Sequence, residues 1–571
     1  MKSILIGWLA LAGTFVLIYH WDDQGIPSPA RDEVGESQPL RSLIEANASE
    51  HEADPHQETQ DSQHVQEKLA VGDDPLQTWF ERRSKKRPNV LFIVADDMRP
   101  DIKAQVHSQS PWIFPGMHTP NLDSLSDRGL LFRRAYCQQA WCNPSRSSFL
   151  TSRRPETTMV HNNSVFFRDV NPNLVTIPQY FRQNGYLTLG MGKVFHLMGL
   201  RGDHDDDFSW SMPMYRNGEC FSEGWDTWKA VSKDDRHGLQ LLDEVIADFA
   251  VETLEKVAPM SQKEDQPFFV AVGLKKPHLS FVFPDEYLKY YPEENITSPI
   301  NPTSAEDLPD IAWFHSFEVR GRREYKKAAE KWSQKQPLEE WAIKELRRAY
   351  WATISYVDDL VGKIIGKLEE LGVADDTIIS FIGDHGFHLG EQSIVGKNTN
   401  FEVANNSPMI LRVPGLTDKG LITDKLVEFV DLFPTLADLA GLPSVPQCPP
   451  GTRESQQTDL CTEGSSLVPL LRDQESSRWK DRVFYQYPHY VDYSWCMGFT
   501  VRTAKYRFTE WVSYDYKETG ADWNKICGTE LFDHEVDPNE TKNLANDASL
   551  TKTIQELRSQ LKGGWSEAVP S

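Results

Sequence analysis

The stretch Cys142-Asn143-Pro144-Ser145-Arg146 combines residue types that can hold an oxyanion. Pro144 suits the first turn of a helix, because its missing N–H would have no partner there, and Phe149 and Leu150 supply an apolar face. Cys142 is therefore expected at or just before a helix N-terminus, which favours anions. Arg146 follows one helical turn later on the same face. The alternative is that Cys142 is a small buried core residue, as free cysteines usually are.

Two acidic clusters each follow a continuous apolar run. The apolar run 89–95 is followed directly by Asp96-Asp97, and the apolar run 377–382 is followed by Gly383-Asp384-His385. Such runs are typical of strands buried on both faces of a parallel sheet, and ligands bind beyond the carboxyl ends of these strands. The carboxylates favour Ca²⁺ or Mg²⁺ over Zn²⁺, with His385 as one nitrogen ligand or a hydrogen-bonding group. A single acidic pair would more simply cap a helix, but two clusters on neighbouring predicted strands favour a metal site.

Cationic residues follow further predicted strands. Lys193 and His196 follow the strand and turn at residues 185–188. The apolar run 267–273 is followed by Lys275, Lys276 and His278, and the second acidic cluster is followed by Lys397. A lone lysine is usually a solvated surface charge. Because these residues recur where the acidic clusters also lie, the sequence predicts one charged pocket at the end of the sheet.

The order of predicted elements indicates an α/β fold. A helix predicted over residues 338–371, stopped by Gly372, leads into the second apolar strand. Strands that alternate with helices predict a mostly parallel sheet flanked by helices, here over residues 86–440. Aromatic runs at residues 482–487 and 506–512 follow a loop rich in Pro, Cys and Gly. They predict a smaller antiparallel α+β subdomain over residues 441–571.

The length and net charge of the chain exclude some classes of function. The chain has 571 residues, with 60 Lys and Arg against 84 Asp and Glu, which gives a formal net charge of −24. This length allows two globular parts, and the charge excludes general nucleic-acid binding, which needs a basic surface. An acidic ligand must therefore meet a local cationic pocket.

Six of the seven cysteines remain once Cys142 is set aside for chemistry. Cys448 and Cys461 flank a loop that a disulfide could close, and Cys496 and Cys527 could pair within the C-terminal region. Isolated buried thiols are the alternative, because spacing alone does not give connectivity.

The N-terminal part is predicted to be a secretory signal segment followed by a polar linker, or stem, at residues 20–85. The apolar run at residues 4–19 predicts a signal peptide or a short uncleaved membrane anchor. Residues 20–85 are polar and acidic, and we expect them to be disordered. The sequons that begin at Asn47, Asn162, Asn295 and Asn405 are candidate glycan sites in a translocated chain.

Five segments carry a family resemblance: V-L-F-I-V-A-D-D-M-R-P, C-N-P-S-R-S-S-F-L-T-S-R-R-P-E-T-T, G-K-V-F-H, K-K-P-H and G-D-H-G-F-H-L-G-E. Over residues 89–543 the chain resembles the sulfatases, and among them the iduronate-2-sulfatase branch. The resemblance implies an alkaline-phosphatase-like fold. The chain departs from the family at Ser152, where Gly is usual, at Lys275, where His is frequent, in the long N-terminal extension and in the insert at residues 201–228.

The resemblance also implies roles for the candidate residues. The ligands of one Ca²⁺ would be Asp96, Asp97, Asp384, His385 and Cys142 after its oxidation to formylglycine. The sulfate-binding and proton-transfer residues would be Arg146, Lys193, His196, His278 and Lys397. The hydrated aldehyde would attack sulfur, and His278 would protonate the leaving sugar oxygen.

The same resemblance suggests partners and a location. The substrate would be a sulfated glycan, with the 2-O-sulfate of iduronate in glycosaminoglycans of the heparan or dermatan sulfate type as the first candidate. A formylglycine-generating enzyme would act during maturation. The location would be lysosomal, extracellular or anchored in the lumen of the secretory pathway. The alternatives are another sulfated polysaccharide, a phosphonate or phosphodiester substrate, and an unmodified, inactive glycan-binding protein.

Overall fold

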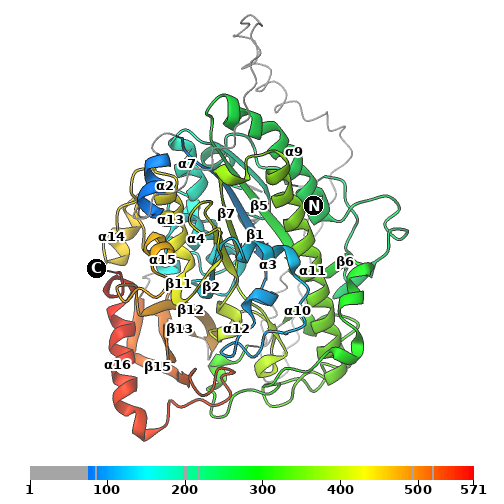
Figure 1. Cartoon of the computed structure of the whole chain (residues 1–571). Coiled ribbons are helices and arrows are strands. Elements are labelled where there is room, and N and C mark those ends of the chain that lie inside the picture. The colour runs from blue at the N-terminus through cyan, green and yellow to red at the C-terminus, as the bar shows by residue number, and fades with distance from the viewer. Residues whose placement is uncertain are drawn as a thin grey trace, which may run out of the picture. The chain divides into compact units, whose positions relative to one another are not determined.

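The computed structural model describes residues 75–83, 86–196, 204–216, 218–314, 317–491, 494–516 and 520–570. A seven-stranded sheet in the order β11-β2-β10-β7-β1-β5-β3 lies at its centre (Figure 1). The strands are β1 (Asn89–Asp96), β2 (Leu130–Tyr136), β3 (Leu187–Gly192), β5 (Phe268–Pro277), β7 (Thr377–Gly383), β10 (Met409–Arg412) and β11 (Leu421–Glu428).

The central sheet is mostly parallel, as the sequence predicts. Strand β1 pairs in parallel with β5 and β7, β3 with β5, and β11 with β2. Only β10, among these seven strands, runs antiparallel to its neighbours, β2 and β7. The carboxyl ends of β3, β5, β1 and β7 therefore lie side by side along one edge of the sheet.

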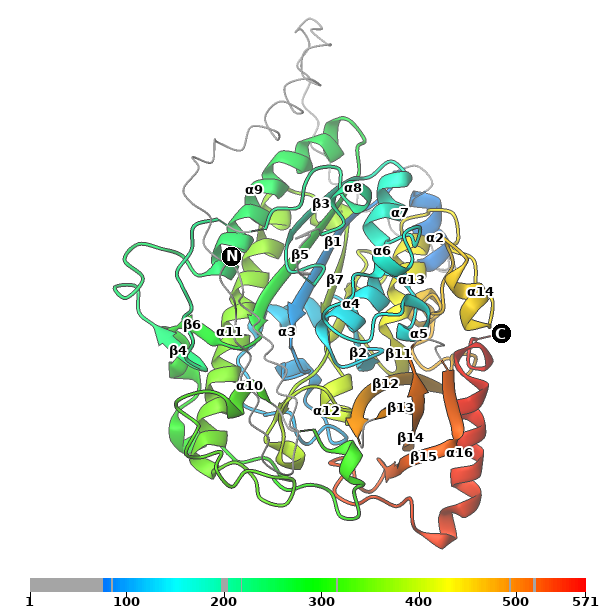
Figure 2. The same cartoon turned by 180° about the vertical axis from the view of Figure 1, so that it is seen from behind.

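Helices cover both faces of the sheet. In both views α9 (Leu242–Lys263) and α11 (Glu340–Glu370) lie on one side, and α4 (Cys142–Thr151), α7 (Ile177–Gln183) and α13 (Leu432–Leu439) lie on the other (Figure 1, Figure 2). Two hydrophobic cores fill the two interfaces. The apolar runs seen in the sequence are continuous because each strand supplies both cores.

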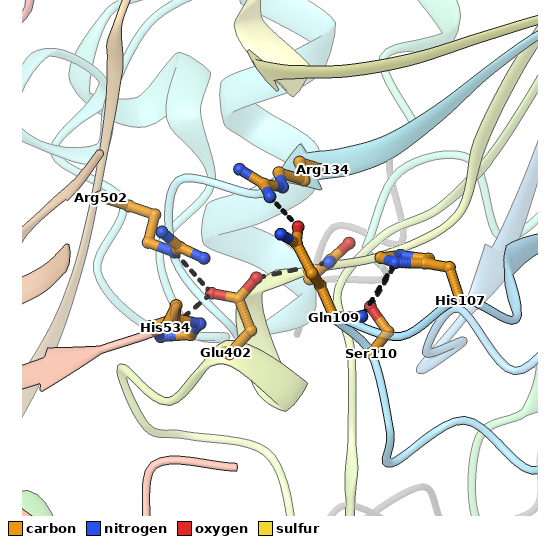
Figure 3. A pocket seen from close by; sticks show the side chains of 8 residues that line it. His107, Gln109, Ser110, Arg134, Glu402, Arg502 and His534 are labelled. Carbon is orange, nitrogen blue, oxygen red and sulfur yellow. Dashed lines mark hydrogen bonds and ion pairs between the residues drawn. The ribbon is translucent and has the colours of Figure 1, made fainter. Parts of the chain in front are cut away.

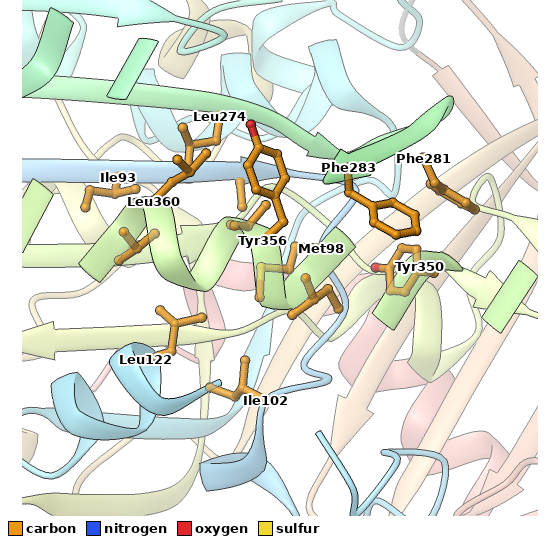
Figure 4. Packing of buried hydrophobic residues seen from close by; sticks show 14 of the residues in the cluster. Ile93, Met98, Ile102, Leu122, Leu274, Phe281, Phe283, Tyr350, Tyr356 and Leu360 are labelled. Atoms are coloured by element: carbon orange, nitrogen blue, oxygen red, sulfur yellow. The ribbon is translucent and has the colours of Figure 1, made fainter. Parts of the chain in front are cut away.

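Strand β1 shows this alternation. Leu91 and Ile93 belong to the core under α9 and α11, whereas Val90 and Phe92 belong to the opposite core. Figure 4 shows the first core, where Tyr356 and Leu360 of α11 lie near Ile93 of β1 and Leu274 of β5. The long helix predicted before the second apolar strand is confirmed as α11, and Gly372 follows its end with a φ of 66°.

A second, antiparallel sheet forms the C-terminal part, which confirms the predicted smaller subdomain. Its order is β12-β13-β14-β15. The strands are β12 (Arg482–Val491), β13 (Ser494–Thr503), β14 (Tyr506–Asp515) and β15 (Gly520–Asp533). Helix α16 (Thr551–Gly563) packs on one face through Leu557 and Leu561. The disulfides Cys448–Cys461 and Cys496–Cys527 are both present, so both suggested pairings are confirmed.

Shorter elements connect these layers. The helices are α2 (Pro75–Arg83), α3 (Pro120–Ser126), α5 (Pro155–Thr158), α6 (Phe167–Val170), α8 (Asp206–Ser209), α10 (Phe317–Arg320), α12 (Glu402–Asn405), α14 (Thr452–Gln456) and α15 (Val468–Arg472). The strands are β4 (Trp228–Val231), β6 (Phe281–Pro284), β8 (His388–Leu389) and β9 (Val395–Gly396).

A buried polar network joins the two sheets around a narrow pocket (Figure 3). Glu402 of α12 accepts a hydrogen bond from Tyr136 Oη of β2 at 2.6 Å and from Arg502 Nε of β13 at 3.0 Å. His534 lies 4.0 Å from the same carboxylate. Because a buried charge needs such partners, Glu402 helps to fix how the C-terminal sheet docks on the central sheet.

Two sequence expectations need correction. The segment expected to be disordered up to residue 85 ends in helix α2, because Leu76 and Trp79 are apolar enough to pack into the core beside α15. Asn405 is fully buried, and its amide donates hydrogen bonds to the carbonyl oxygens of Thr399 and Phe401, so it is not a glycan site.

The N-terminal expectations lie outside the described residues. They concern the apolar run 4–19, most of the stem and the sequon at Asn47. Among the helices that the structure does describe, none combines the length and apolar character needed to cross a membrane.

Acid is expected to destabilise the junction of the two parts through Glu428. Burial raises the pKa of Glu428, but Arg154 and Lys480, at 2.8 and 2.9 Å, lower it to about 2. A carboxyl group whose pKa is depressed on folding stabilises the protein above its unfolded pKa. This contribution, on the order of 3 kcal/mol, is lost as the pH falls from about 4.5 towards 2.

Chemical unfolding of the wild type and Glu428→Gln between pH 7 and pH 2 measures this effect. The variant should be less stable at pH 7, and the difference should shrink below pH 4.5. Glu556→Gln, which changes an exposed helix residue, is the control and should follow the wild type. A constant difference across the whole range would contradict the assignment.

Candidate active site

Helix α4 places the cysteine motif at the edge of the sheet. The helix begins at Cys142, with Trp141 as its N-cap, and all of its residues are buried. Cys142 is 1% exposed and its Sγ lies 3.8 Å from Asp97 Oδ1. The sequence-based prediction of a helix N-terminus at Cys142 is confirmed.

Arg146 connects the two acidic clusters, one turn along α4. Its guanidinium donates to Asp384 Oδ2 at 3.0 Å and to Asp96 Oδ1 at 3.1 Å. It also donates to the backbone carbonyls of Lys193 and Val194, which follow β3. One fully buried side chain therefore holds the ends of β1, β3 and β7 together.

The backbone at Asp97 takes an unusual conformation that its neighbours stabilise. Its φ is 59°, which is uncommon for a residue other than Gly. The N–H of Asp97 donates to Asp384 Oδ1 at 2.8 Å, and Tyr350 Oη donates to the Asp97 carbonyl at 2.6 Å. This turn directs the carboxylates of Asp96 and Asp97 into the same space.

The possible metal ligands converge on this space. One group with ligand atoms within 4.8 Å of one another is Asp96, Asp97, Cys142 and His278, and a second is Cys142, Asp384 and His385. His385 Nε2 is buried and has no hydrogen-bond partner among the described residues. Its distances to carboxylate oxygens of Asp97 and Asp384 are 3.4 and 3.7 Å. An oxygen-rich donor set with an unpartnered imidazole nitrogen fits a hard divalent cation.

Two lysines pair with the carboxylates. Lys397 Nζ lies 2.7 and 2.6 Å from the two oxygens of Asp97, and Lys193 Nζ pairs with Asp96. Lys193 is positioned by close contact between β3 and β5, since its N–H donates to the Gly273 carbonyl at 2.7 Å. A Cβ atom on Gly273 would lie 2.0 Å from the Lys193 carbonyl carbon, so only glycine fits there.

The two candidate histidines differ in how they are held. His278 Nδ1 bonds with the Leu279 carbonyl at 2.5 Å, and its Nε2 lies 3.9 Å from Asp97 Oδ2. His196 is partly buried on the loop after Lys193, and its Nδ1 has no hydrogen-bond partner within the described chain. The structure therefore places His278 against the carboxylates but gives no such contact for His196.

Burial and mutual charges set the protonation of the site. Burial, together with the charge of Lys397, lowers the pKa of His278 well below its ordinary value, and burial does the same at His196. Burial raises the pKa of the Cys142 thiol well above its ordinary value. For Asp96 the charges of Lys193, His278 and Arg146 outweigh burial and hold the pKa well below its usual range, whereas burial raises that of Asp384 to about 6.

Several neighbouring residues were not predicted from the sequence. Glu318 Oε1 of α10 lies 3.4 Å from Lys397 Nζ. Glu223, from the insert at residues 201–228, bonds to Lys275 at 3.1 Å and to Lys276 at 3.0 Å. Neither glutamate belongs to a motif or follows an apolar strand, so no sequence signal indicated it. Ser145, whose hydroxyl donates to the Asp384 carbonyl, lies inside the cysteine motif and was detectable there.

Comparison with known proteins gives both family and fold. The Sulfatase family model matches residues 88–442, and the model of the C-terminal part of N-sulphoglucosamine sulphohydrolase matches residues 390–566. The iduronate 2-sulfatases of Mus musculus and Homo sapiens are each 35% identical to this chain over 527 residues. These alignments cover 82% of this chain and 93% of each relative.

Solved structures agree with this fold. A 2-O GAG sulfatase is 23% identical, with a TM-score of 0.57 and coverage of 85% of this chain and 93% of its own. The phosphonate monoester hydrolase of Agrobacterium radiobacter is 20% identical, with a TM-score of 0.60 and coverage of 85% and 96%.

The mixed sheet, the flanking helices and the antiparallel C-terminal sheet thus form an alkaline-phosphatase-like hydrolase fold with a buried cluster of charged residues at the sheet edge. The chain belongs to the sulfatase family. It is a sulfuric ester hydrolase similar to the iduronate 2-sulfatases, as the resemblance in its sequence predicted.

Proposed function

We propose that this sulfatase removes the 2-O-sulfate of iduronate from glycosaminoglycans of the heparan or dermatan sulfate type. The observation that carries the proposal is the 35% identity to two iduronate 2-sulfatases, which extends over 93% of their length. Both the cysteine motif on α4 and the carboxylates on β1 and β7 lie within the aligned family region, residues 88–442.

Asp96, Asp97, Asp384 and His385 are the residues that would hold one divalent cation, with Cys142 as its neighbour. The unpartnered His385 Nε2 and the oxygen-rich set support Ca²⁺ as that cation. When bound, the cation and a formylglycine made from Cys142 would supply an acidified hydroxyl nucleophile and polarise the sulfate ester. The formylglycine-generating enzyme is the maturation partner that this chemistry requires.

The chain's own cations orient the sulfate group. Arg146 is held in place by two carboxylates, so it provides a fixed positive charge beside Cys142. Lys193 and Lys397 exchange part of their carboxylate contact for the sulfuryl oxygens when the substrate enters. Preorganised donors of this kind stabilise the charge that develops in the transition state.

His278 is the proposed proton donor to the leaving sugar oxygen. Its Nδ1 contact with the Leu279 carbonyl leaves Nε2 directed towards the carboxylates. A bound sulfate ester adds negative charge next to this imidazole, which raises its pKa and favours the protonated form. His196, on the loop after Lys193, is the second histidine that we assign to this group.

The proposed substrate is consistent with a secretory route. We assign the apolar run 4–19 to a signal peptide or membrane anchor, and residues 86–440 and 441–571 to the catalytic domain and its C-terminal subdomain. Asn162 and Asn295 remain candidate glycan sites. Lysosomal, extracellular and anchored lumenal locations are all compatible with this assignment.

A desulfation panel tests the proposal. Disaccharides sulfated at the uronate 2-position, the glucosamine 6-position or the glucosamine nitrogen are incubated with the enzyme at acid and neutral pH, together with a phosphonate monoester. Release of sulfate from the 2-sulfated iduronate unit, with a kcat/KM at least about tenfold above that of the other compounds, is expected. Preference for another sulfated unit or for the phosphonate would overturn the assignment.

A further inference from the structure

A second pocket lies between the C-terminal sheet and α5, and its lining shares no residue with the candidate active site. Residues of β12, β13 and β15 form one side, and α5, α14 and the end of α16 form the others. Its volume is about 160 Å³, whereas about 10–15 Å³ suffices for a single water molecule. The pocket is therefore large enough for a small organic ligand.

Several buried polar atoms of the lining have no hydrogen-bond partner among the residues that the structure describes. They are both amide atoms of Gln138, Oε1 of Glu156 and Nε of Arg154. Gln138 is 1% exposed. Buried polar atoms are nearly always bonded, so a cluster of unpartnered ones in one cavity indicates a polar ligand.

The opposite wall is aromatic. Trp523, Trp565 and Phe499 are each partly exposed and line the same pocket. Aromatic rings that stay partly exposed at a pocket wall offer a flat apolar surface to a ligand. A suitable ligand therefore has one apolar face and several hydroxyl groups around its edge.

The charge of the lining argues against an anionic ligand. Arg154 already bonds to Glu428 at 2.8 Å and to the Phe484 carbonyl at 3.0 Å. Glu156 is the other ionisable acid or base in the lining apart from the tyrosine, and burial raises its pKa to about 7. Lys562 Nζ lies 5.3 Å from the centroid of the Trp523 ring but is not part of the lining. Among the described lining residues a sulfated unit would therefore find no unengaged cation, whereas a neutral hydroxyl can donate to or accept from the carboxyl group.

We propose that this pocket binds an uncharged sugar unit, with its ring face against the aromatic wall and its hydroxyls bonded to Gln138 and Glu156. The site would hold a glycan independently of the chemistry at Cys142. Because this pocket shares no residue with the candidate active site, this inference does not depend on which sulfate ester the enzyme cleaves.

Isothermal titration of the full-length enzyme with N,N′,N″-triacetylchitotriose, maltotriose and cellotriose tests the proposal, with a sulfated heparin hexasaccharide as the anionic probe. At least one neutral trisaccharide should bind with a Kd of about 1 mM or tighter. Trp523→Ala should weaken this binding about tenfold or more through lost ring contact. Trp565→Ala provides a second wall variant should the first unfold.

Trp341→Ala is the matched control, because Trp341 is a half-exposed tryptophan on α11 outside the pocket. It should bind the sugar like the wild type. Hydrolysis of a small aryl sulfate should be equal in all of these proteins, which separates this site from the proposed function. Binding of the hexasaccharide alone, binding insensitive to both wall variants, or no binding of any neutral probe would each overturn the proposal.

Discussion

Replacing Cys142 by Ala is expected to lower kcat/KM for a small aryl sulfate by about 10⁴-fold or more, because the variant lacks the atom from which the nucleophile is made. The side chain lies at the N-terminus of α4, buried beside Asp97 and within the ligand distances described above. Alanine removes only a sulfur atom, so the fold should persist. Steady-state kinetics and thermal unfolding of the same preparation measure both effects.

Cys137→Ala is the matched control for this substitution. Cys137 is also a fully buried free cysteine, and its Sγ contacts Asn405 Oδ1 at 3.7 Å instead of the carboxylates. This variant should keep its activity. The mass of the peptide that spans Cys142 in the wild type should show the loss of mass that accompanies conversion of a thiol to an aldehyde. A fully active preparation with an intact thiol at this position would contradict the assignment.

Removal of the divalent cation is expected to abolish turnover, with a loss in kcat/KM of about 10³-fold or more, since such an ion stabilises the transition state by several kcal/mol. Dialysis against a chelator, checked by elemental analysis, should also lower the Tm, because the cation binds only the folded protein. Added Ca²⁺ should restore both activity and Tm.

Asp384→Asn tests whether the chelator lowers the Tm by removing a cation from this site. This variant keeps the shape of the side chain but loses one of the three charges facing the cation, so the chelator should no longer shift its Tm. Asp234→Asn, at an exposed loop position, should respond like the wild type. Equal Tm and equal activity of the metal-free and loaded wild type would exclude a cation at this site.

The sheet edge was predictable because each signal there is local. The apolar runs before Asp96 and Asp384 are uninterrupted. In β1 this is because successive side chains pack alternately into the two cores, so the residues on both faces of the strand must be apolar. Parallel neighbours must end at one edge, so the convergence of both clusters with Lys193 and His278 followed from the strand assignment alone. Cys142 was placed by proline and by the apolar residues that follow it.

The remaining features depend on tertiary contacts without a local signal. Glu318 and Glu223 lie in irregular or very short elements, and only the folded chain brings them to Lys397 and Lys276. The pocket beside Trp523 combines α5 with five elements of the C-terminal part that are far from it in the sequence. The burial of Asn405 likewise follows from the packing of α12, and the three residues of a sequon do not indicate whether its asparagine is buried.

The two lysines and the arginine match the charges of the three aspartates before any ligand arrives. Asp96, Asp97 and Asp384 face Arg146, Lys193 and Lys397 in direct ion pairs. A divalent cation at this set, as proposed, would add two positive charges, which would attract a sulfate group, and the bound anion would in turn favour retention of the cation. Thermodynamic linkage makes this reciprocal, so inorganic sulfate, the reaction product, should raise the equilibrium affinity for the metal by the same factor as the metal raises the affinity for sulfate.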